Sequence, residues 1–328
     1  MFTIATNRFE KPDWLTTIFQ LKGSVILIIL PRILFFCGFT TAITLLYTLD
    51  FPIYFQKLGD LTTNVIYNLI LGLLVVFRTN TSYDRFWEGR KAWGVLAIDI
   101  RNLAQEIRVG VAERDETDFL EKQSVMRLLS AFAIATKLHL RGEAVNDELK
   151  ALLTPARAEQ LEASSNRPFD IIFWIRCYLQ KVLSKGEITE SKVGAIDNML
   201  NQLTGGVSGC ERIITTPIPI TYRVYLKRLI LIYCIGLPFK TIPELTWWSL
   251  PIVAVVSFLL LGVEEVAREL ENPFGYNVND LPLDDFCRTI ASNVEHVLSL
   301  ETQIELTPKK ELQESLSGQL QLFSVSHM

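Results

Sequence analysis

The residues best placed to do chemistry lie in one charged stretch, RTNTSYDRFWEGRKAWG, which covers residues 78–94. Within it Arg85 and Glu88, and then Glu88 and Lys91, stand three residues apart, the spacing at which opposite charges meet on a helix. Such pairs form an ion-pair face against water or another helix and supply no nucleophile or general base. The glycine-rich GGVSG at 205–209 lacks the Lys-Ser/Thr that follows a phosphate-binding loop. We therefore predict that the chain has no catalytic residues and is not an enzyme.

Metal-binding side chains are also scattered. The five cysteines have no metal-type spacing, and none of the three histidines has a cysteine or a second histidine close by in the sequence. A zinc site needs about four such ligands at short spacing, so we expect no metal site. The net charge of −4 argues against a nucleic-acid partner.

The element that carries the charged stretch begins upstream as an apolar run, LTTNVIYNLILGLLVVF, at 61–77. Its length is slightly below the roughly 20 residues that cross a hydrocarbon core. We predict one continuous helix that leads from the membrane straight into a water-exposed region.

Two stripes run along this predicted helix at four-residue spacing. One contains small or amide side chains, which usually pack against a neighbouring helix: Asn64, Asn68 and Gly72. The other is apolar and contains Leu69, Leu73 and Phe77. An apolar stripe usually faces lipid or core, and the alternative is that this helix lines a pore.

The composition fits a protein that lies partly in lipid, since 49% of residues are hydrophobic, 21% are charged and the mean hydropathy is +0.26. Four transmembrane spans are predicted, at residues 24–49 (with the main crossing after Arg32), 61–77, 220–239 and 247–263. The loops between paired spans, at 50–60 and 240–246, contain one Lys each. Most other basic residues lie in the remaining segments. We therefore predict a protein of the cell membrane whose two termini and middle region are on the cytoplasmic side.

The remaining segments show helical periodicity and no useful strand pattern, so the fold class is predicted to be all-α. Helices are expected at 82–108, 120–140, 146–167 with a break at Pro155, 169–183, 191–211 and 284–300. The chain then divides into 1–77 with the first two spans, a helical cytosolic region at 78–217, two spans at 218–263, a cytosolic segment at 264–305, and a flexible tail at 306–328.

Three motifs together resemble the bestrophin family, in its prokaryotic and plant branch: RTNTSYDRFWEGRKAWG, GCERIITTPIP with the following Tyr222, and ENPFG followed by NDLPLD. They occur in the right order among the right hydrophobic spans. The motif residues are Arg78, Asn80, Tyr83, Arg85, Glu88, Arg90, Trp93, Glu211, Arg212, Pro217, Pro219, Asn272 and Pro273.

The resemblance implies a homopentameric ion channel, mostly of the anion-conducting kind, whose helical cytosolic domain extends the membrane pore. It implies a pore neck at Leu69, Leu73 and Phe77 and a second constriction at Ile218 or Thr216. A hydrophobic neck can gate by dewetting and favours ions that lose water easily, which points to chloride or other monovalent anions. A cation-selective channel and a non-conducting membrane scaffold or sensor remain the alternatives.

The sequence departs from the animal members of the family after NPFG. Their dense acidic run, which helps to hold calcium, is replaced here by YNVNDLPLDD. Calcium needs six or more oxygen ligands. Asp280, Asp284 and Asp285 could supply some, but helix capping by Asp284 explains the cluster equally well. We therefore expect no cofactor.

Overall fold

The computed structural model describes residues 23–51 and 56–301, so the tail predicted at 306–328 lies outside the described residues. All regular secondary structure in these two ranges is helical, which confirms the all-α class. The helices are α2 (Ile26–Thr48), α3 (Gln56–Thr63), α4 (Val65–Gly110), α5 (Glu116–Arg141), α6 (Asp147–Lys150), α7 (Pro155–Ala163), α8 (Arg167–Ser184), α9 (Glu190–Thr215), α10 (Ile220–Leu245), η2 (Thr246–Trp248), α11 (Ser249–Glu271) and α12 (Leu283–Ser299).

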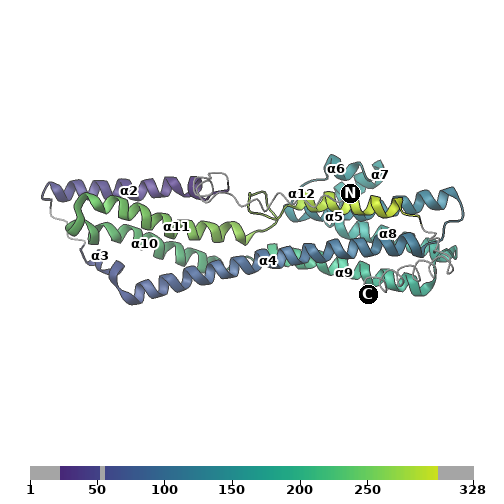
Figure 1. The fold of residues 1–328 in the computed structure, drawn as a ribbon, viewed down its shortest axis with the longest axis horizontal. Coiled ribbons are helices and arrows are strands. Elements are labelled where there is room, and N and C mark those ends of the chain that lie inside the picture. The colour runs from purple at the N-terminus through teal and green to yellow at the C-terminus, as the bar shows by residue number, and fades with distance from the viewer. Residues whose placement is uncertain (1–22, 52–55, 302–328) are drawn as a thin grey trace, which may run out of the picture.

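The molecule is elongated, with two helical bundles placed end to end (Figure 1). We call α2, α3, α10, α11 and the first part of α4 the membrane bundle. The second part of α4 joins α5 to α9 and α12 in what we call the distal bundle. Only α4 runs the length of both bundles, so it is the main structural link between them.

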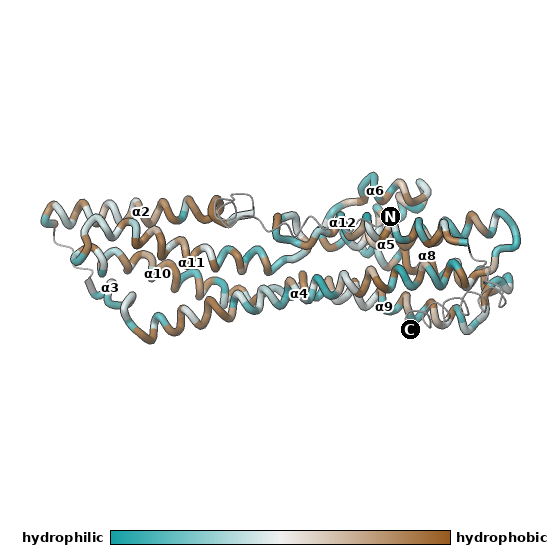
Figure 2. The backbone as a smooth tube through the Cα atoms, viewed as in Figure 1, coloured by the Kyte–Doolittle hydropathy of each residue, from teal (hydrophilic) through white to brown (hydrophobic). Residues whose placement is uncertain are grey.

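Three stretches of the described residues are long and apolar enough to cross a membrane: Ile26–Thr48, Val65–Gly110 and Ile220–Glu271. The third stretch folds back on itself, because η2 joins α10 and α11 and the two helices lie side by side (Figure 1). The membrane bundle therefore contains four long apolar helical segments. Along α4, the first turns are mostly hydrophobic and the middle is polar (Figure 2).

The predicted continuous helix through the apolar and charged stretches is confirmed, and α4 is 46 residues long. It begins at Val65, because Asn64 is extended and its side chain accepts a hydrogen bond from the backbone N–H of Tyr67. The Asn68 amide bonds the carbonyl oxygen of Thr62 at 2.9 Å. The two asparagines thus lie at the junction of α3 and α4, where Asn64 caps the helix and does not belong to a helical stripe. Packing of Asn68 and Gly72 against a neighbouring helix stays a prediction.

The boundary predicted after the third span is wrong. The loop predicted at 240–246 is helical, since α10 continues through Pro238 and Pro243 to Leu245. Away from water a backbone leaves fewer groups unsatisfied as a helix than as a loop, and prolines are tolerated there. α11 does not end at Glu264 but continues for two turns to Glu271.

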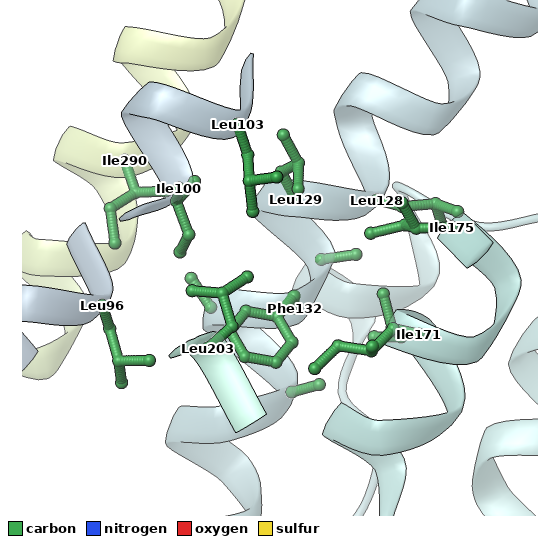
Figure 3. Packing of buried hydrophobic residues seen from close by; sticks show 14 of the residues in the cluster. Leu96, Ile100, Leu103, Leu128, Leu129, Phe132, Ile171, Ile175, Leu203 and Ile290 are labelled. Atoms are coloured by element: carbon green, nitrogen blue, oxygen red, sulfur yellow. The ribbon is translucent and has the colours of Figure 1, made fainter. Parts of the chain in front are cut away.

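The core of the distal bundle comes mainly from α4, α5, α8, α9 and α12, with one residue each from α6 and α7, and α4 contributes one whole face to it. Figure 3 shows Ile100 and Leu103 of α4 packed with side chains of α5, α8, α9 and α12. All of these side chains are buried, including Phe132 of α5 and Leu203 of α9. A separate apolar cluster fills the membrane bundle and includes Leu71 of α4. Burial in both clusters fixes the rotation of α4 about its axis.

Candidate functional site

The predicted neck residues lie on the face of α4 that points away from its own subunit. Leu71 and Arg78 are 4% and 2% exposed and define the inner face. At 100° per residue, Leu69 and Leu73 lie about 160° around the helix from Leu71, and Phe77 lies about 120° from it. Their exposed fractions are 68%, 50% and 54%. The three side chains form an outward apolar stripe that the rest of residues 23–51 and 56–301 leaves exposed, and it spans about 12 Å at 1.5 Å per residue.

Directly after this stripe, Arg78 is buried against the end of α11. Its Nη2 lies 3.3 Å from Oε2 of Glu271 and 3.9 Å from Oε1 of Glu264. Both glutamates are themselves buried, at 7% and 3% exposed. Because a buried charge without a partner costs several kcal/mol, this cluster anchors α4 to α11 just below the predicted neck.

Arg85 lies two turns further along the same face of α4 as Arg78 and extends the anchor. Its guanidinium donates to the carbonyl oxygens of Glu271 at 3.0 Å and of Ile213 and Thr216 at 2.5 Å. These carbonyls lie at the C-terminal ends of α11 and α9, where unpaired acceptors and the helix dipole favour a cation. Arg85 therefore joins three helix segments, and its predicted pairing with Glu88 is wrong.

Glu88 and Lys91 of the motif also have partners other than those predicted. Glu88 pairs with Arg212 of α9 at 2.6 Å, in place of the predicted pair with Lys91. Lys91 lies over the ring of Trp87, with its ammonium 5.8 Å from the ring centroid. Glu211, next to Arg212, has an oxygen 2.7 Å from Nε2 of His139.

The aromatic part of the motif packs against α12. The guanidinium of Arg90 lies 4.9 Å from the centroid of the Phe286 ring, and the Trp93 ring lies 6.2 Å from it. Trp93 is 1% exposed, whereas Asn80 and Tyr83 lie on the exposed side of α4. The charged motif therefore contributes both to the inside of the subunit and to its outer surface.

The TPIP segment lies between α9 and α10, where Pro217 and Pro219 interrupt the helices as predicted. The backbone N–H of Ile218 donates to Oε1 of Glu271 at 3.2 Å, and the Ile218 side chain is only 6% exposed. Thr216 is exposed. Of the two residues predicted for a second constriction, the structure therefore buries Ile218 in the subunit and leaves Thr216 accessible.

Glu271 was not among the residues singled out in the sequence. Its carboxylate serves both Arg78 and the backbone of Ile218, so it connects α4 with the TPIP segment. A signal for it exists, because α11 carries four glutamates within eight residues directly after an apolar span: Glu264, Glu265, Glu269 and Glu271. Four acidic residues at that position predict buried cationic partners. The sequence does not show which cations these are, because Arg78 lies almost 200 residues before Glu271.

The ENPFG motif packs directly against α4 at Gly89. Oδ1 of Asn272 accepts the N–H of Phe274, which holds the turn after α11. A Cβ at Gly89 would lie 2.9 Å from Cγ of Pro273 and 3.1 Å from Cζ of Phe274. Neither ring can move without disturbing the turn, so α4 approaches the motif this closely only because residue 89 is glycine.

Gly89→Ala is expected to destabilise the protein by about 1–3 kcal/mol, the usual cost of overpacking a filled interior. Thermal unfolding of the purified chain in detergent measures the loss. Gly94→Ala on the same helix is the control, since its Cβ would meet only Arg90 at an ordinary 3.5 Å. That variant should be neutral or gain up to about 1 kcal/mol from helix propensity. Equal effects of the two variants would contradict the close approach.

The three aspartates considered for calcium are already engaged. Asp284 pairs with Lys137 at 2.9 Å and with Arg141 at 3.1 Å, one through each carboxylate oxygen. Asp280 accepts the backbone N–H of Asn277. Asp285 pairs with Arg288 in its own helix. Within residues 23–51 and 56–301 there is no group of three acidic, histidine or cysteine side chains that could hold a metal ion.

Asp284 instead clamps α12 to α5. Burial acts to raise the pKa of Asp284, but the hydrogen bonds from Lys137 and Arg141 more than offset it, and the pKa lies below its usual value. Burial likewise acts to lower the pKa of Lys137. The hydrogen bonds that its ammonium donates to Glu148 and Asp284 raise the pKa above the ordinary value. The clamp is therefore intact between the ordinary pKa values of the two groups, about 4 and about 10.

Asp284→Asn is expected to cost about 1–2 kcal/mol near neutral pH, because Lys137 and Arg141 lose an anionic partner that is itself half exposed. The difference from the unchanged protein should shrink as the pH falls from about 4 through the lowered pKa of folded Asp284, because the carboxylate is then protonated in the native state as well. Thermal unfolding across this pH range is the measurement. Glu295→Gln, which breaks an exposed pair with Arg127 between the same helices, should cost less than about 1 kcal/mol at every pH. A pH-independent loss in Asp284→Asn would contradict the clamp.

Comparison with known proteins identifies this arrangement. A family profile described as "Bacterial/Fungal Bestrophin protein" matches residues 6–296. A voltage-dependent anion channel-forming protein of Nostoc sp. is 45% identical over 294 residues, which are 90% of this chain and 94% of that protein. A protein described in the same words from Synechocystis sp. is 40% identical over 291 residues, 88% of this chain and 92% of that protein.

Solved structures with the same fold point to the same family as the sequence relatives. The crystal structure of a bacterial bestrophin homologue from Klebsiella pneumoniae matches with a TM-score of 0.72 and 27% identity, over 83% of this chain and 99% of that one. The resemblance inferred from the three motifs is confirmed, and the chain belongs to the bacterial and fungal bestrophin family.

Proposed function

We propose that the chain is a membrane channel that conducts ions passively, with anions as the permeant ions. The observation that carries this proposal is the outward apolar stripe at the membrane end of α4, which the other described residues of the subunit leave uncovered. Repeated around an axis, Leu69, Leu73 and Phe77 form a hydrophobic collar that excludes water when narrow and favours weakly hydrated anions. The descriptions of the Nostoc and Synechocystis relatives as anion channel-forming proteins support the choice of anions.

The channel is a homopentamer in this proposal, as the family resemblance implies. Further along α4 the outer face stays partly apolar in the distal bundle, where Tyr83, Trp87, Val95 and Ile98 are each about half exposed. An apolar face of this length on a water-exposed helix is typical of a subunit interface. Rotational symmetry then brings the five stripes together at one axis. Thr216, or Ile218 after a rotation of its side chain, forms a second constriction on that axis.

The membrane orientation follows from the basic residues. All four apolar helical segments cross the cell membrane, and both termini and the distal bundle are cytoplasmic. Lys57 and Lys240 are the basic residues near the opposite, outer end of the membrane bundle, whereas Arg32, Lys227 and Arg228 lie toward the distal bundle. This excess of cations on one side supports the cytoplasmic assignment.

The test is ion flux through the purified protein in liposomes and planar bilayers under a potassium chloride gradient. We expect a reversal potential close to the chloride equilibrium value. A potential near the potassium value would make the channel cation-selective instead. Absence of flux of either ion from correctly assembled protein would favour a scaffold or sensor.

A further inference from the structure

A cavity of about 520 Å³ lies between α2, α10 and α11, at the end of the membrane bundle that adjoins the distal bundle. Its volume is in the range of sites that hold small molecules or lipid headgroups. One side is lined by apolar residues, among them Phe35, Leu231 and Leu261. Phe35 and Leu231 are also exposed on the outer surface of the bundle, at 62% and 45%, so the apolar side continues onto the surface that faces lipid.

The other side of the cavity carries two cations and one carboxylate. The side chains of Arg32 and Lys227 are 46% and 54% exposed, so both keep donors available. Arg32 lies 3.3 Å from Glu265, but that carboxylate is also bound by Arg268 at 2.5 Å. Arg32 is therefore only partly neutralised by its own subunit.

Glu264 is the carboxylate that lines the cavity, and its side chain is 2% exposed. Its Oε1 has no hydrogen bond within the described chain, since Lys227 is 3.7 Å and Arg78 3.9 Å away. A buried carboxylate oxygen without a donor costs free energy until a donor arrives. The cavity therefore presents two cations for an anion and one acceptor for a hydroxyl group.

We propose that this cavity binds phosphatidylglycerol from the membrane leaflet on the side of the distal bundle. The phosphodiester lies between Arg32 and Lys227, a headgroup hydroxyl donates to Oε1 of Glu264, and an acyl chain follows Phe35 and Leu231. Basic pockets between transmembrane helices on the cytoplasmic side are suited to anionic headgroups.

The charge balance selects this headgroup. Arg32 and Lys227 against Glu264 leave one positive charge, which a phosphodiester monoanion neutralises. Phosphatidylcholine is zwitterionic and has no hydroxyl or N–H in its headgroup to satisfy Glu264. The bound lipid sits next to Arg78, the residue that follows Phe77, so its site adjoins the anchor beneath the neck. The proposal needs only a membrane location and is independent of which ion is conducted.

The experiment measures lipid bound to the full-length protein after delipidation in detergent. Phosphatidylglycerol and phosphatidylcholine with identical acyl chains are added back separately. Native mass spectrometry counts the retained lipid, and the thermal transition reports stabilisation. We expect retention of phosphatidylglycerol with a rise in the transition temperature, and retention of phosphatidylcholine at least about tenfold weaker, as loss of a charge-assisted contact implies.

Two variants locate the site. Lys227→Gln removes one cation while leaving the 3.3 Å pair of Arg32 with Glu265 in place, and Leu231→Trp fills the apolar side without changing any charge. Each should reduce phosphatidylglycerol retention about tenfold. Lys240→Gln, at the other end of α10 in an exposed pair with Glu244, should retain it fully. Equal retention of the two lipids, or no loss in either variant, would overturn the proposal and assign the cavity to non-specific lipid or a neighbouring subunit.

Discussion

Leu73→Ala and Phe77→Ala are each expected to increase anion current about tenfold in planar bilayers. In a ring of five, each substitution removes five apolar groups from the narrowest part of the collar at once. A reduction of only about 1.4 kcal/mol in the barrier to ion entry, shared among five subunits, gives a tenfold change in rate. Wetting of the wider collar supplies this reduction, since the barrier of a hydrophobic constriction depends on excluding water. Selectivity between anions of different size should weaken in parallel.

The matched control is Leu34→Ala on α2. Leu34 is 60% exposed, like the neck residues, and its substitution removes the same side-chain atoms as Leu73→Ala, but it lies on a different helix of the membrane bundle. Its current should equal that of the unchanged protein. Unchanged currents in Leu73→Ala and Phe77→Ala, from pentamers of normal stability, would mean that the stripe packs against lipid or a neighbouring helix and lines no pore.

Glu271→Gln is expected to destabilise the protein by about 3–5 kcal/mol, the range found when one partner of a buried ion pair is removed. Arg78 is 2% exposed, and its Nε and Nη1 atoms already lack hydrogen bonds. Without the carboxylate of Glu271, its nearest anion is Glu264 at 3.9 Å. Thermal or denaturant unfolding in detergent measures the loss. Conduction should fall with it, because the same side chain holds the backbone of Ile218.

Two further variants separate a buried anchor from a simple loss of charge. Glu88→Gln breaks an ion pair with Arg212 in which both side chains are exposed, so it should cost less than about 1 kcal/mol. The double variant Arg78→Met with Glu271→Met removes both members of the 3.3 Å pair and should be less destabilised than Glu271→Gln, since Arg78 is no longer a buried cation without its partner and Glu264 keeps Lys227 at 3.7 Å. If Glu271→Gln were no worse than Glu88→Gln, the anchor would contribute nothing to stability.

Most of the helical architecture could be predicted from local patterns. The change from an apolar run to a charged one without a helix breaker correctly predicts α4, and Pro217 with Pro219 correctly predicts the interruption between α9 and α10. The errors occur where surroundings override local signals. Helix α10 continues through Pro238 and Pro243, and α11 continues past Glu264, which is buried beside cations.

The candidate site could be predicted only in part. Spacing places Leu69, Leu73 and Phe77 on one stripe, and the family resemblance assigns them to a neck. Which way the stripe points depends on the packing of the opposite face in two separate clusters, which no local pattern contains. The partners of Arg78 and Arg85 were missed for the same reason, since they lie on α9 and α11, more than 120 residues away in sequence.

Helix α4 is unbroken, and the anchor at Arg78 lies much nearer to its first residue than to its last. Its 46 residues extend about 69 Å, and the anchor at Arg78 divides it into arms of about 20 Å toward the neck and about 48 Å toward its far end. Any tilt about that anchor moves the two tips in opposite directions, and the far tip travels about two and a half times as far. In the proposed channel, a shift of several ångströms at the far end of the distal bundle thus becomes a smaller shift of the stripe, larger at Leu69 than at Phe77, which lies next to the anchor.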